Sequence, residues 1–157
     1  MYGFNNTSRM VLSLAVAKQL SEKCNTLFVN FETFGGFKGI LKGEEEQNLS
    51  DALYAFRQNH NQFHKNIVNA ISHYDRLDYI PDTSCADDID DIKAEELGTF
   101  VQGIGRELGY SYIVVDIGDG LRMPWNMMDC FDEIYMCDGD NYLEKSKVRN
   151  FENMVME

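Results

Sequence analysis

The sequence predicts a three-layer α/β/α fold with a mostly parallel β-sheet. Short apolar runs alternate along the chain with longer segments of helical spacing, which is the pattern of strands joined by helical crossovers. The short runs are apolar at consecutive positions, as expected for parallel strands that are buried on both faces. The chain has 157 residues, which suits one domain, so we expect a single domain over residues 1–157.

The first two elements are predicted from residues 8–22 and 26–31. Residues 8–22 have helical spacing, and Thr7 or Ser8 can cap the start of this helix. Its expected apolar stripe consists of Met10, Val11, Leu14, Val16 and Ala17. Residues 26–31, Thr-Leu-Phe-Val-Asn-Phe, form a run that is typical of a buried parallel strand.

The middle of the chain predicts a helix over residues 48–58 and a short strand over residues 77–80. The strand ends at Pro81, which cannot donate a ladder hydrogen bond. Residues 63–74 fit either a helix or irregular structure.

The second half of the chain continues the alternation. The expected elements are a helix that opens at the acidic residues 87–91, a helix over 94–108, a strand over 112–116, a short helix over 125–130, a strand over 133–137 and a final helix over 141–156. Gly109 marks the end of the second of these helices. The final helix has apolar residues on one side, and we expect that side to pack against the core; these residues are Leu143, Val148, Phe151, Met154 and Val155.

The charge of the chain excludes some classes of partner. Asp and Glu number 26 against 14 Lys and Arg, a net charge of -12. Nucleic acids and anionic membrane surfaces attract cationic proteins, so neither is expected to bind. No signal peptide and no apolar run of membrane-spanning length is evident. The four cysteines lack CxxC spacing, so we expect reduced thiols in a cytoplasmic protein.

Topology predicts where a ligand would bind. In open α/β sheets, ligands lie at the carboxyl ends of the parallel strands. The predicted strands place Asn30, Glu32, Pro81, Asp116 and Asp138 on or near that edge.

Three motifs follow in order along the chain. The loop Tyr2-Gly-Phe-Asn-Asn-Thr-Ser8 leads into a helix, a strand ends in Asn30-Phe-Glu32, and a later segment reads Tyr110-Ser-Tyr-Ile-Val-Val-Asp-Ile-Gly-Asp-Gly120. In this order they resemble the MinD/ParA group of P-loop ATPases, including relatives that serve pilus assembly. In that group the loop reads KGGVGKT or GGVGTS, the next strand ends in DxD, and a later strand reads YDYIIIDTPPG.

The resemblance implies a P-loop NTPase-like fold that binds ATP and Mg²⁺ and forms homodimers. Backbone amides at a helix N-terminus bind phosphate, and a Ser or Thr hydroxyl and a strand-end Asp hold Mg²⁺. The resemblance assigns Mg²⁺ to Ser8 and Asp116, and orientation of the attacking water to Glu32 as the catalytic carboxylate. It assigns nucleotide binding to Gly3, Asn5, Asn6, Thr7 and Ser8.

The phosphate-binding loop departs from the family pattern. Phe4 and Asn6 stand at two glycine positions, and Tyr2 and Thr7 stand at the two lysine positions, so the Walker A motif is degenerate. Arg9 is next to the loop, but we expect its side chain to point along the helix rather than to replace a lysine. The resemblance also implies a strand before the loop and further strands after the last helix. We therefore expect a fragment that is truncated at the N-terminal strand and at the C-terminal end.

Two functions agree with these motifs. One is a nucleotide-dependent regulatory or assembly switch with weak or no hydrolysis; the other is a pseudo-ATPase scaffold that binds proteins without nucleotide. A receiver domain would have an acidic pair near its first strand and a strand-end lysine, and the sequence shows neither arrangement. The expected partners are proteins, either a second copy or other subunits of an assembly system, with no stable membrane insertion.

Overall fold

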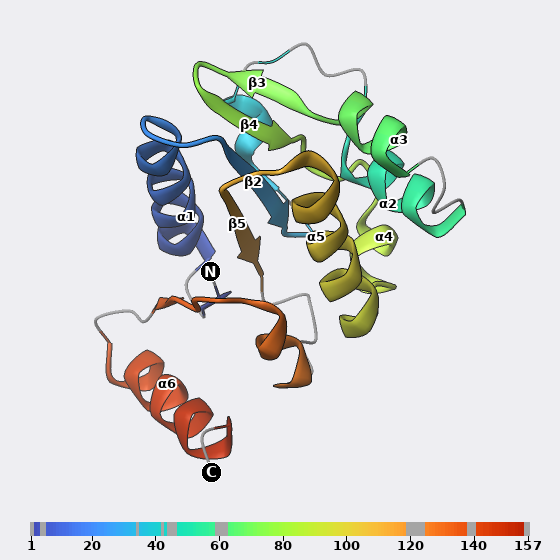
Figure 1. Cartoon of the computed structure of the whole chain (residues 1–157). Helices are drawn as coiled ribbons and strands as arrows, with labels where there is room; N and C mark the ends of the chain where they lie inside the picture. Colours follow the sequence, from blue (N-terminus) through green and yellow to red (C-terminus); the bar gives the residue numbers. More distant parts are fainter. Residues whose placement is uncertain are drawn as a thin grey trace.

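The structure is a computed structural model that describes residues 2–3, 6–33, 35–41, 43, 47–58, 63–118, 125–137 and 141–155. These residues form a six-stranded sheet with the strand order β3-β4-β2-β5-β1-β6 (Figure 1). Neighbouring strands are parallel except for β3 and β4, which are antiparallel. The predicted mostly parallel sheet is therefore confirmed.

Helices connect the strands and cover them. The strands are β1 (Tyr2–Gly3), β2 (Thr26–Phe31), β3 (Ser72–Tyr74), β4 (Leu77–Ile80), β5 (Tyr112–Ile117) and β6 (Met136–Cys137). The α-helices are α1 (Asn6–Ser21), α2 (Leu49–Gln58), α3 (Phe63–Asn69), α4 (Ala86–Asp90), α5 (Ala94–Leu108) and α6 (Tyr142–Val155), with 3-10 helices η1 (Phe37–Gly39) and η3 (Trp125–Cys130). Gly109 ends α5 in the left-handed conformation, as its position predicts.

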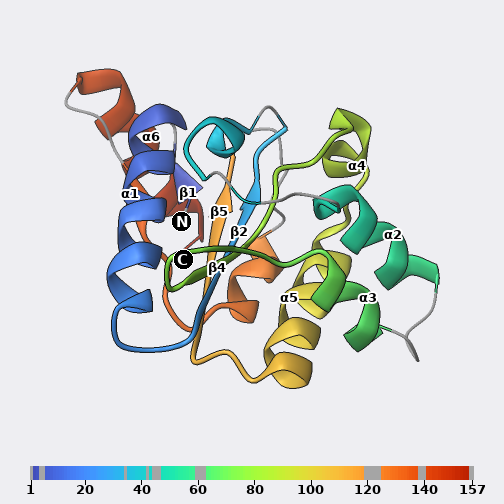
Figure 2. The same ribbon diagram turned by 90° about the horizontal axis from the view of Figure 1, so that it is seen from above.

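The sheet lies between two layers of helices. Figure 2 shows α1 on one side of the sheet and α2, α3, α4 and α5 on the other. The larger core cluster lies beneath α2, α3 and α5, and a smaller cluster lies between α1, η1 and the opposite face. This arrangement confirms the predicted three-layer architecture.

Four aromatic rings form the centre of the larger cluster. The Phe100 ring contacts the rings of Phe31, Phe56 and Phe63 edge-on, with centroids 5.5 to 6.2 Å apart. Phe100 has no exposed surface. Edge-to-face contacts of this kind stabilise aromatic pairs beyond the burial of their area. The rings thereby connect α2, α3 and α5 to the central strand β2.

Helix α1 buries an unexpected face. Its fully or almost fully buried residues are Arg9, Ser13, Ala17 and Ser21, which follow one another at intervals of four. Val11, which we expected on the apolar stripe, is 61% exposed. Met10, Leu14 and Ala17 of the predicted stripe do pack in the smaller core cluster. The buried face nevertheless extends past this stripe to Arg9, Ser13 and Ser21, and its small side chains allow α1 to approach the sheet closely.

Two strands of the sheet differ from the sequence prediction by their presence, and a third is shorter than predicted. Residues 72–74 form β3, which pairs with β4 through a tight turn where Asp75 has a positive φ of 54°. Residues 2–3, predicted as loop, form β1 between β5 and β6. The strand expected over residues 133–137 is shorter, because only Met136 and Cys137 pair with a neighbour.

The final helix corrects another expectation. Figure 1 shows α6 below the other layers and away from both faces of the sheet. Leu143, which we expected in the core, is 72% exposed, and Val148 is half-buried. The side chains of Phe151, Met154 and Val155 lie outside the described residues. Among the described helices, none combines the length and the apolar character needed to cross a bilayer.

One buried hydroxyl gives the fold a testable pH dependence. The Tyr110 hydroxyl donates a hydrogen bond of 2.7 Å to Asp78 on β4. Burial, followed by this hydrogen bond and the charge of Asp78, raises the pKa of Tyr110. A raised pKa in the folded state means that the stabilisation is complete below the ordinary tyrosine pKa of about 10 and is lost as the pH rises above it.

We expect Tyr110→Phe to lower the free energy of unfolding by about 1–2 kcal/mol at pH 8, because Asp78 loses a donor. Above about pH 10 the difference from the wild type should shrink by up to about 1.4 kcal/mol per pH unit. Urea unfolding of the wild type and Tyr110→Phe at pH 8 and above about pH 10 measures this difference in stability. A difference that does not change with pH would contradict this assignment. Tyr54→Phe, at an exposed position, should change stability at pH 8 by less than about 0.5 kcal/mol.

Candidate functional site

The candidate site lies where β2 and β5 end beneath the start of α1. Residues on neighbouring parallel strands point to the same face when they are in register, and Asn30 is in register with Asp116. Farther back on this face, Phe28 is part of the apolar cluster and Val114 packs against it. Toward the strand ends the side chains become polar, so the edge carries Asn30, Glu32 and Asp116 next to the first turn of α1.

Arg9 joins two carboxylates at this edge. Its Nε donates to Asp116 Oδ1 over 2.7 Å, and its Nη2 donates to Glu32 Oε2. Arg9 and Asp116 are both 0% exposed, and Glu32 is 8% exposed. One guanidinium therefore crosses from α1 to the ends of two strands, which makes the expected orientation of Arg9 along the helix wrong.

The charges of this buried group depend on one another. Burial opposes the charge on Arg9, but Asp116 and then Glu32 favour it, and the net effect raises the pKa of the guanidinium. Arg9 is therefore a permanent cation in the folded protein. With both carboxylates ionised, the three side chains carry one negative charge in total.

Gly118 makes room for this arrangement. Gly118 comes directly after Ile117 of β5, which forms the last pair of the two strands with Phe31 of β2. A Cβ atom at Gly118 would overlap the Glu32 carboxylate. The glycine thus allows Glu32 to turn toward Arg9 at the strand end.

Some polar atoms at the edge have no hydrogen bond within the described part of the chain. They include Asn30 Oδ1 and Asp116 Oδ2, both of which are buried. Asn30 Nδ2 donates to Asp82 Oδ1 over 2.8 Å, and the backbone N–H of Phe37 donates to the other oxygen of Asp82. A buried oxygen that lacks a hydrogen bond costs about 1–3 kcal/mol.

The structure brings most of the predicted site residues to one edge. Gly3 ends β1, which pairs with β5 and β6, and the register of Tyr2 with Ile117 places the start of α1 near Asp116. Ser8 is exposed on the first turn of α1. Asn6 and Thr7 begin this helix, but their side chains, like all of Asn5, lie outside what the structure describes. Asp138 is also outside the described residues.

Sequence reasoning missed the role of Arg9, although the sequence contains a signal for it. The spacing of Arg9, Ser13 and Ala17 places all three on one helix face. Because two of these residues are polar, the face does not look like a core stripe. The alignment of the charged Arg9 with the small residues Ser13 and Ala17 was the available sign that this face of the helix is buried.

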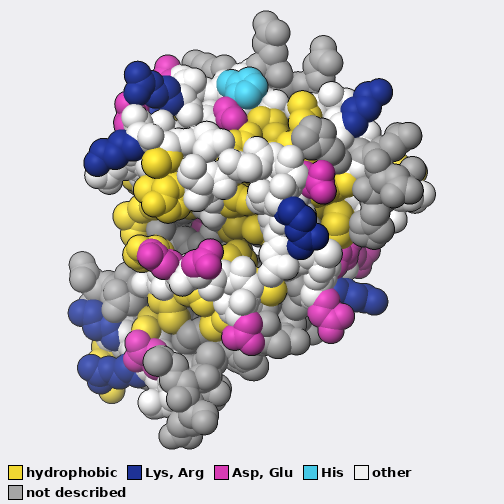
Figure 3. Space-filling model, in the orientation of Figure 1, with side chains coloured by type: hydrophobic (Ala, Val, Ile, Leu, Met, Phe, Trp, Pro, Cys, Tyr) yellow, Lys and Arg dark blue, Asp and Glu magenta, His cyan; other side chains and the backbone are white. Residues whose placement is uncertain are grey.

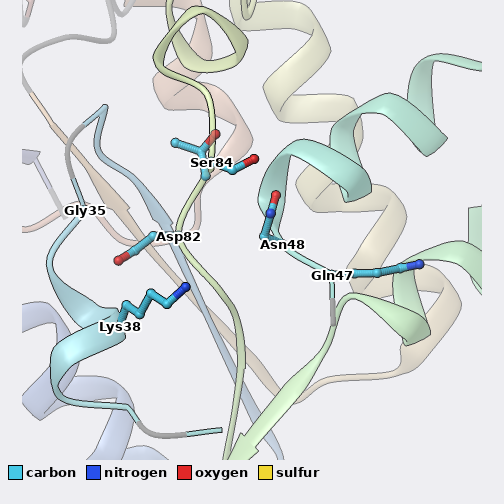
Figure 4. Close-up of a pocket in the computed structure, with 7 residues that line it drawn as sticks. Gly35, Lys38, Gln47, Asn48, Asp82 and Ser84 are labelled. Carbon is cyan, nitrogen blue, oxygen red and sulfur yellow. The ribbon is translucent and has the colours of Figure 1, made fainter. Parts of the chain in front are cut away.

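A polar pocket lies farther along the same edge. It has a volume of about 190 Å³ and is lined by Gly35, Lys38, Gln47, Asn48, Asp82, Thr83 and Ser84. Figure 4 shows Lys38 from η1 and Asp82, which follows β4, on one side of the pocket, and Asn48 before α2 on the other. Sites for drug-sized ligands typically measure about 300–1,000 Å³, so this pocket is too small to be assigned to a whole nucleotide.

Comparison with solved structures identifies the fold. One match is the crystal structure of a ParA family ATPase from Chlorobium tepidum TLS, with a TM-score of 0.71 and 19% identity, covering 98% of this chain. The chain has the ParA-family fold. A second match, described as a plasmid partition protein from Borrelia burgdorferi B31 and bound to AMPPNP, has a TM-score of 0.56 and 16% identity over 99% of this chain.

The ParA-like fold is shared over only part of the matched proteins. The chain spans 66% of the Chlorobium structure and 68% of the Borrelia structure. No protein-family model matches the chain, and no curated protein matches it. At these levels of identity the comparisons establish the fold, while the chemistry has to be argued from the side chains.

The side chains of this ParA-like edge do not fit a Mg²⁺ ion. Arg9 already binds Asp116 Oδ1 and Glu32, the carboxylates that a metal and an attacking water would need. Among the described residues, no group of three or more His, Cys, Asp or Glu side chains is placed to hold a metal.

Proposed function

We propose that this chain is a pseudo-ATPase scaffold, a ParA-like domain that binds proteins and does not hydrolyse ATP. The observation that carries this proposal is the buried bridge from Arg9 to Glu32 and Asp116. Hydrolysis in the resembling family uses a free strand-end carboxylate for Mg²⁺ and a second one for water. In this chain the guanidinium of Arg9 binds both corresponding carboxylates, Asp116 and Glu32.

The loop supports the same conclusion. The family lysines that neutralise phosphate charge are replaced by Tyr2 and Thr7. Without them, a triphosphate would meet Asp116 and Glu32 with Arg9 as the nearest cation on the described edge, and Arg9 is already paired. Electrostatics therefore disfavours the negatively charged triphosphate of a nucleotide at this edge.

Exposed apolar side chains support protein binding. Figure 3 shows hydrophobic side chains on the left of the molecule, where α1 lies. Val11 and Leu12 of α1 are 61% and 48% exposed, and Ile134, Tyr135 and Leu143 are also exposed. Exposed apolar patches of large area are typical of protein interfaces. Homodimerisation, which the resemblance implies, is one form that such binding can take.

A second candidate is the nucleotide-dependent switch. The observation in its favour is the buried Asp116 Oδ2, which has no hydrogen bond within the described part of the chain and could accept one from a ligand-bound water. The AMPPNP-bound Borrelia structure has the same fold.

Titration of ATP with and without Mg²⁺ separates the two candidates. For the scaffold, we expect no saturable heat in calorimetry at about 1 mM nucleotide, which corresponds to a binding free energy weaker than about −4 kcal/mol. Phosphate release should equal that of the buffer. Saturable binding that is lost in Asp116→Asn would support the switch and contradict the scaffold. Sedimentation velocity should give the same oligomeric state with and without nucleotide.

A further inference from the structure

We propose that Arg9 is a built-in cation that replaces a divalent metal ion at the carboxyl edge of the sheet. The inference rests on the proposed function, since it explains how two buried carboxylates are held at the edge without a metal ion. Its basis is the geometry of one guanidinium that donates to carboxylates on two strands. A metal ion would otherwise join the same oxygens.

The position of Arg9 is unfavourable by local criteria. It lies in the first turns of α1, near the helix end where the dipole favours anions over cations. Its side chain is also completely buried, and burial is the largest influence on its pKa, opposing the charge. The positive charge is stable there because it compensates the negative charges of Asp116 and Glu32. Without Arg9, these two carboxylates would still favour a cation at this position.

The oxygens that Arg9 binds are those of a hard-metal site. Mg²⁺ and Mn²⁺ prefer carboxylate and carbonyl oxygens. Glu32 and Asp116 both direct an oxygen to Arg9 from neighbouring strands, and the missing side chain at Gly118 leaves the Glu32 carboxylate its place. Removing the guanidinium would leave two nearly buried carboxylates that face a common position.

The first test removes the cation and offers a metal. In Arg9→Ser, we expect about 10 mM MnCl₂ to raise the melting temperature by about 3–5 °C, the shift for a site of roughly millimolar affinity in a domain of this size. The wild type should shift by less than about 1 °C under the same conditions. The double variant Arg9→Ser/Asp116→Asn should lose the response. An equal response of wild type and Arg9→Ser, or no response in either, would overturn the proposal.

A second measurement uses the wild type and does not depend on the folding of any variant. Paramagnetic broadening of backbone amide signals by Mn²⁺ reports where the ion binds. We expect broadening at the exposed acidic residues Asp87, Asp90 and Asp91, which serve as an internal positive control, and none that is selective for Ser8, Glu32 or Gly118. Selective broadening at those three amides would show that Arg9 does not exclude the metal.

The two proposals fail in different ways. If the wild type hydrolyses ATP but only Arg9→Ser responds to Mn²⁺, the scaffold is wrong and the built-in cation stands. If the wild type neither binds nor hydrolyses ATP but Mn²⁺ binds at Asp116, the built-in cation is wrong and the scaffold stands.

Discussion

Replacing Arg9 with methionine is expected to lower the free energy of unfolding by about 3–5 kcal/mol, because Asp116 and Glu32 lose the buried cation that they share. Methionine fills part of the volume of the arginine stem, so loss of packing is limited. Urea unfolding followed by circular dichroism at pH 7.5 measures the change. Because domains are typically stable by about 5–15 kcal/mol, the loss should be large but measurable.

A matched control separates burial from the loss of an arginine. Arg57 also pairs with a carboxylate, Glu96, but both side chains are partly exposed. Arg57→Met should therefore cost less than about 1 kcal/mol. Similar losses of stability in Arg9→Met and Arg57→Met would show that burial of the Arg9 bridge does not increase its contribution to stability.

The partners of Arg9 provide a further check. In the triple variant Arg9→Met/Glu32→Gln/Asp116→Asn the two carboxylate charges are removed together with the cation, and most of the lost stability should return. If the triple variant is as unstable as the single one, the cost arises from packing and not from charge.

The sequence was sufficient for elements whose pattern is local. Strand β5 was predicted from its continuous apolar run, and α5 from its helical spacing and from Gly109, which adopts the left-handed conformation that ends the helix. The order of these elements led to the three-layer fold and to the correct edge for Glu32 and Asp116. Such predictions succeed because each depends on the hydrophobic pattern and turn chemistry of one segment.

The missed elements depend on partners elsewhere in the chain. Ser72-His-Tyr74 has no apolar pattern and becomes β3 because it pairs with β4 across a tight turn. Tyr2–Gly3 is too short to have a pattern and is extended because it lies between β5 and β6. Strand propensity depends strongly on such context, so a single sequence does not reveal it.

The decisive feature of the site was missed for a similar reason. A charged residue on a helix is usually exposed, and the alignment of Arg9 with Ser13 and Ala17 is the one sign in the sequence that its face is buried. Its two partners are 23 and 107 residues away along the chain. Each carboxylate was correctly placed at the edge, but the cation between them required knowing which face of α1 meets the sheet.

The second large effect is expected at the centre of the core. Phe100→Ala should lower the free energy of unfolding by about 3–5 kcal/mol, because a fully buried ring is removed from the contacts with Phe31, Phe56 and Phe63. Helices α2 and α3 reach α5 through these rings, so the cavity would weaken the whole layer on this face of the sheet. Urea unfolding measures the change.

Two controls test whether the loss arises at this ring cluster. Phe100→Leu conserves most of the volume and should cost less than about 1.5 kcal/mol. Tyr54→Ala removes an aromatic ring from the exposed side of α2 and should cost about 0.5 kcal/mol or less. A Phe100→Ala loss no larger than that of Phe100→Leu would mean that the layer collapses around the missing ring. The core on the α5 side would then be more plastic than its edge-on ring contacts indicate, and the Arg9 bridge would be the larger determinant of stability.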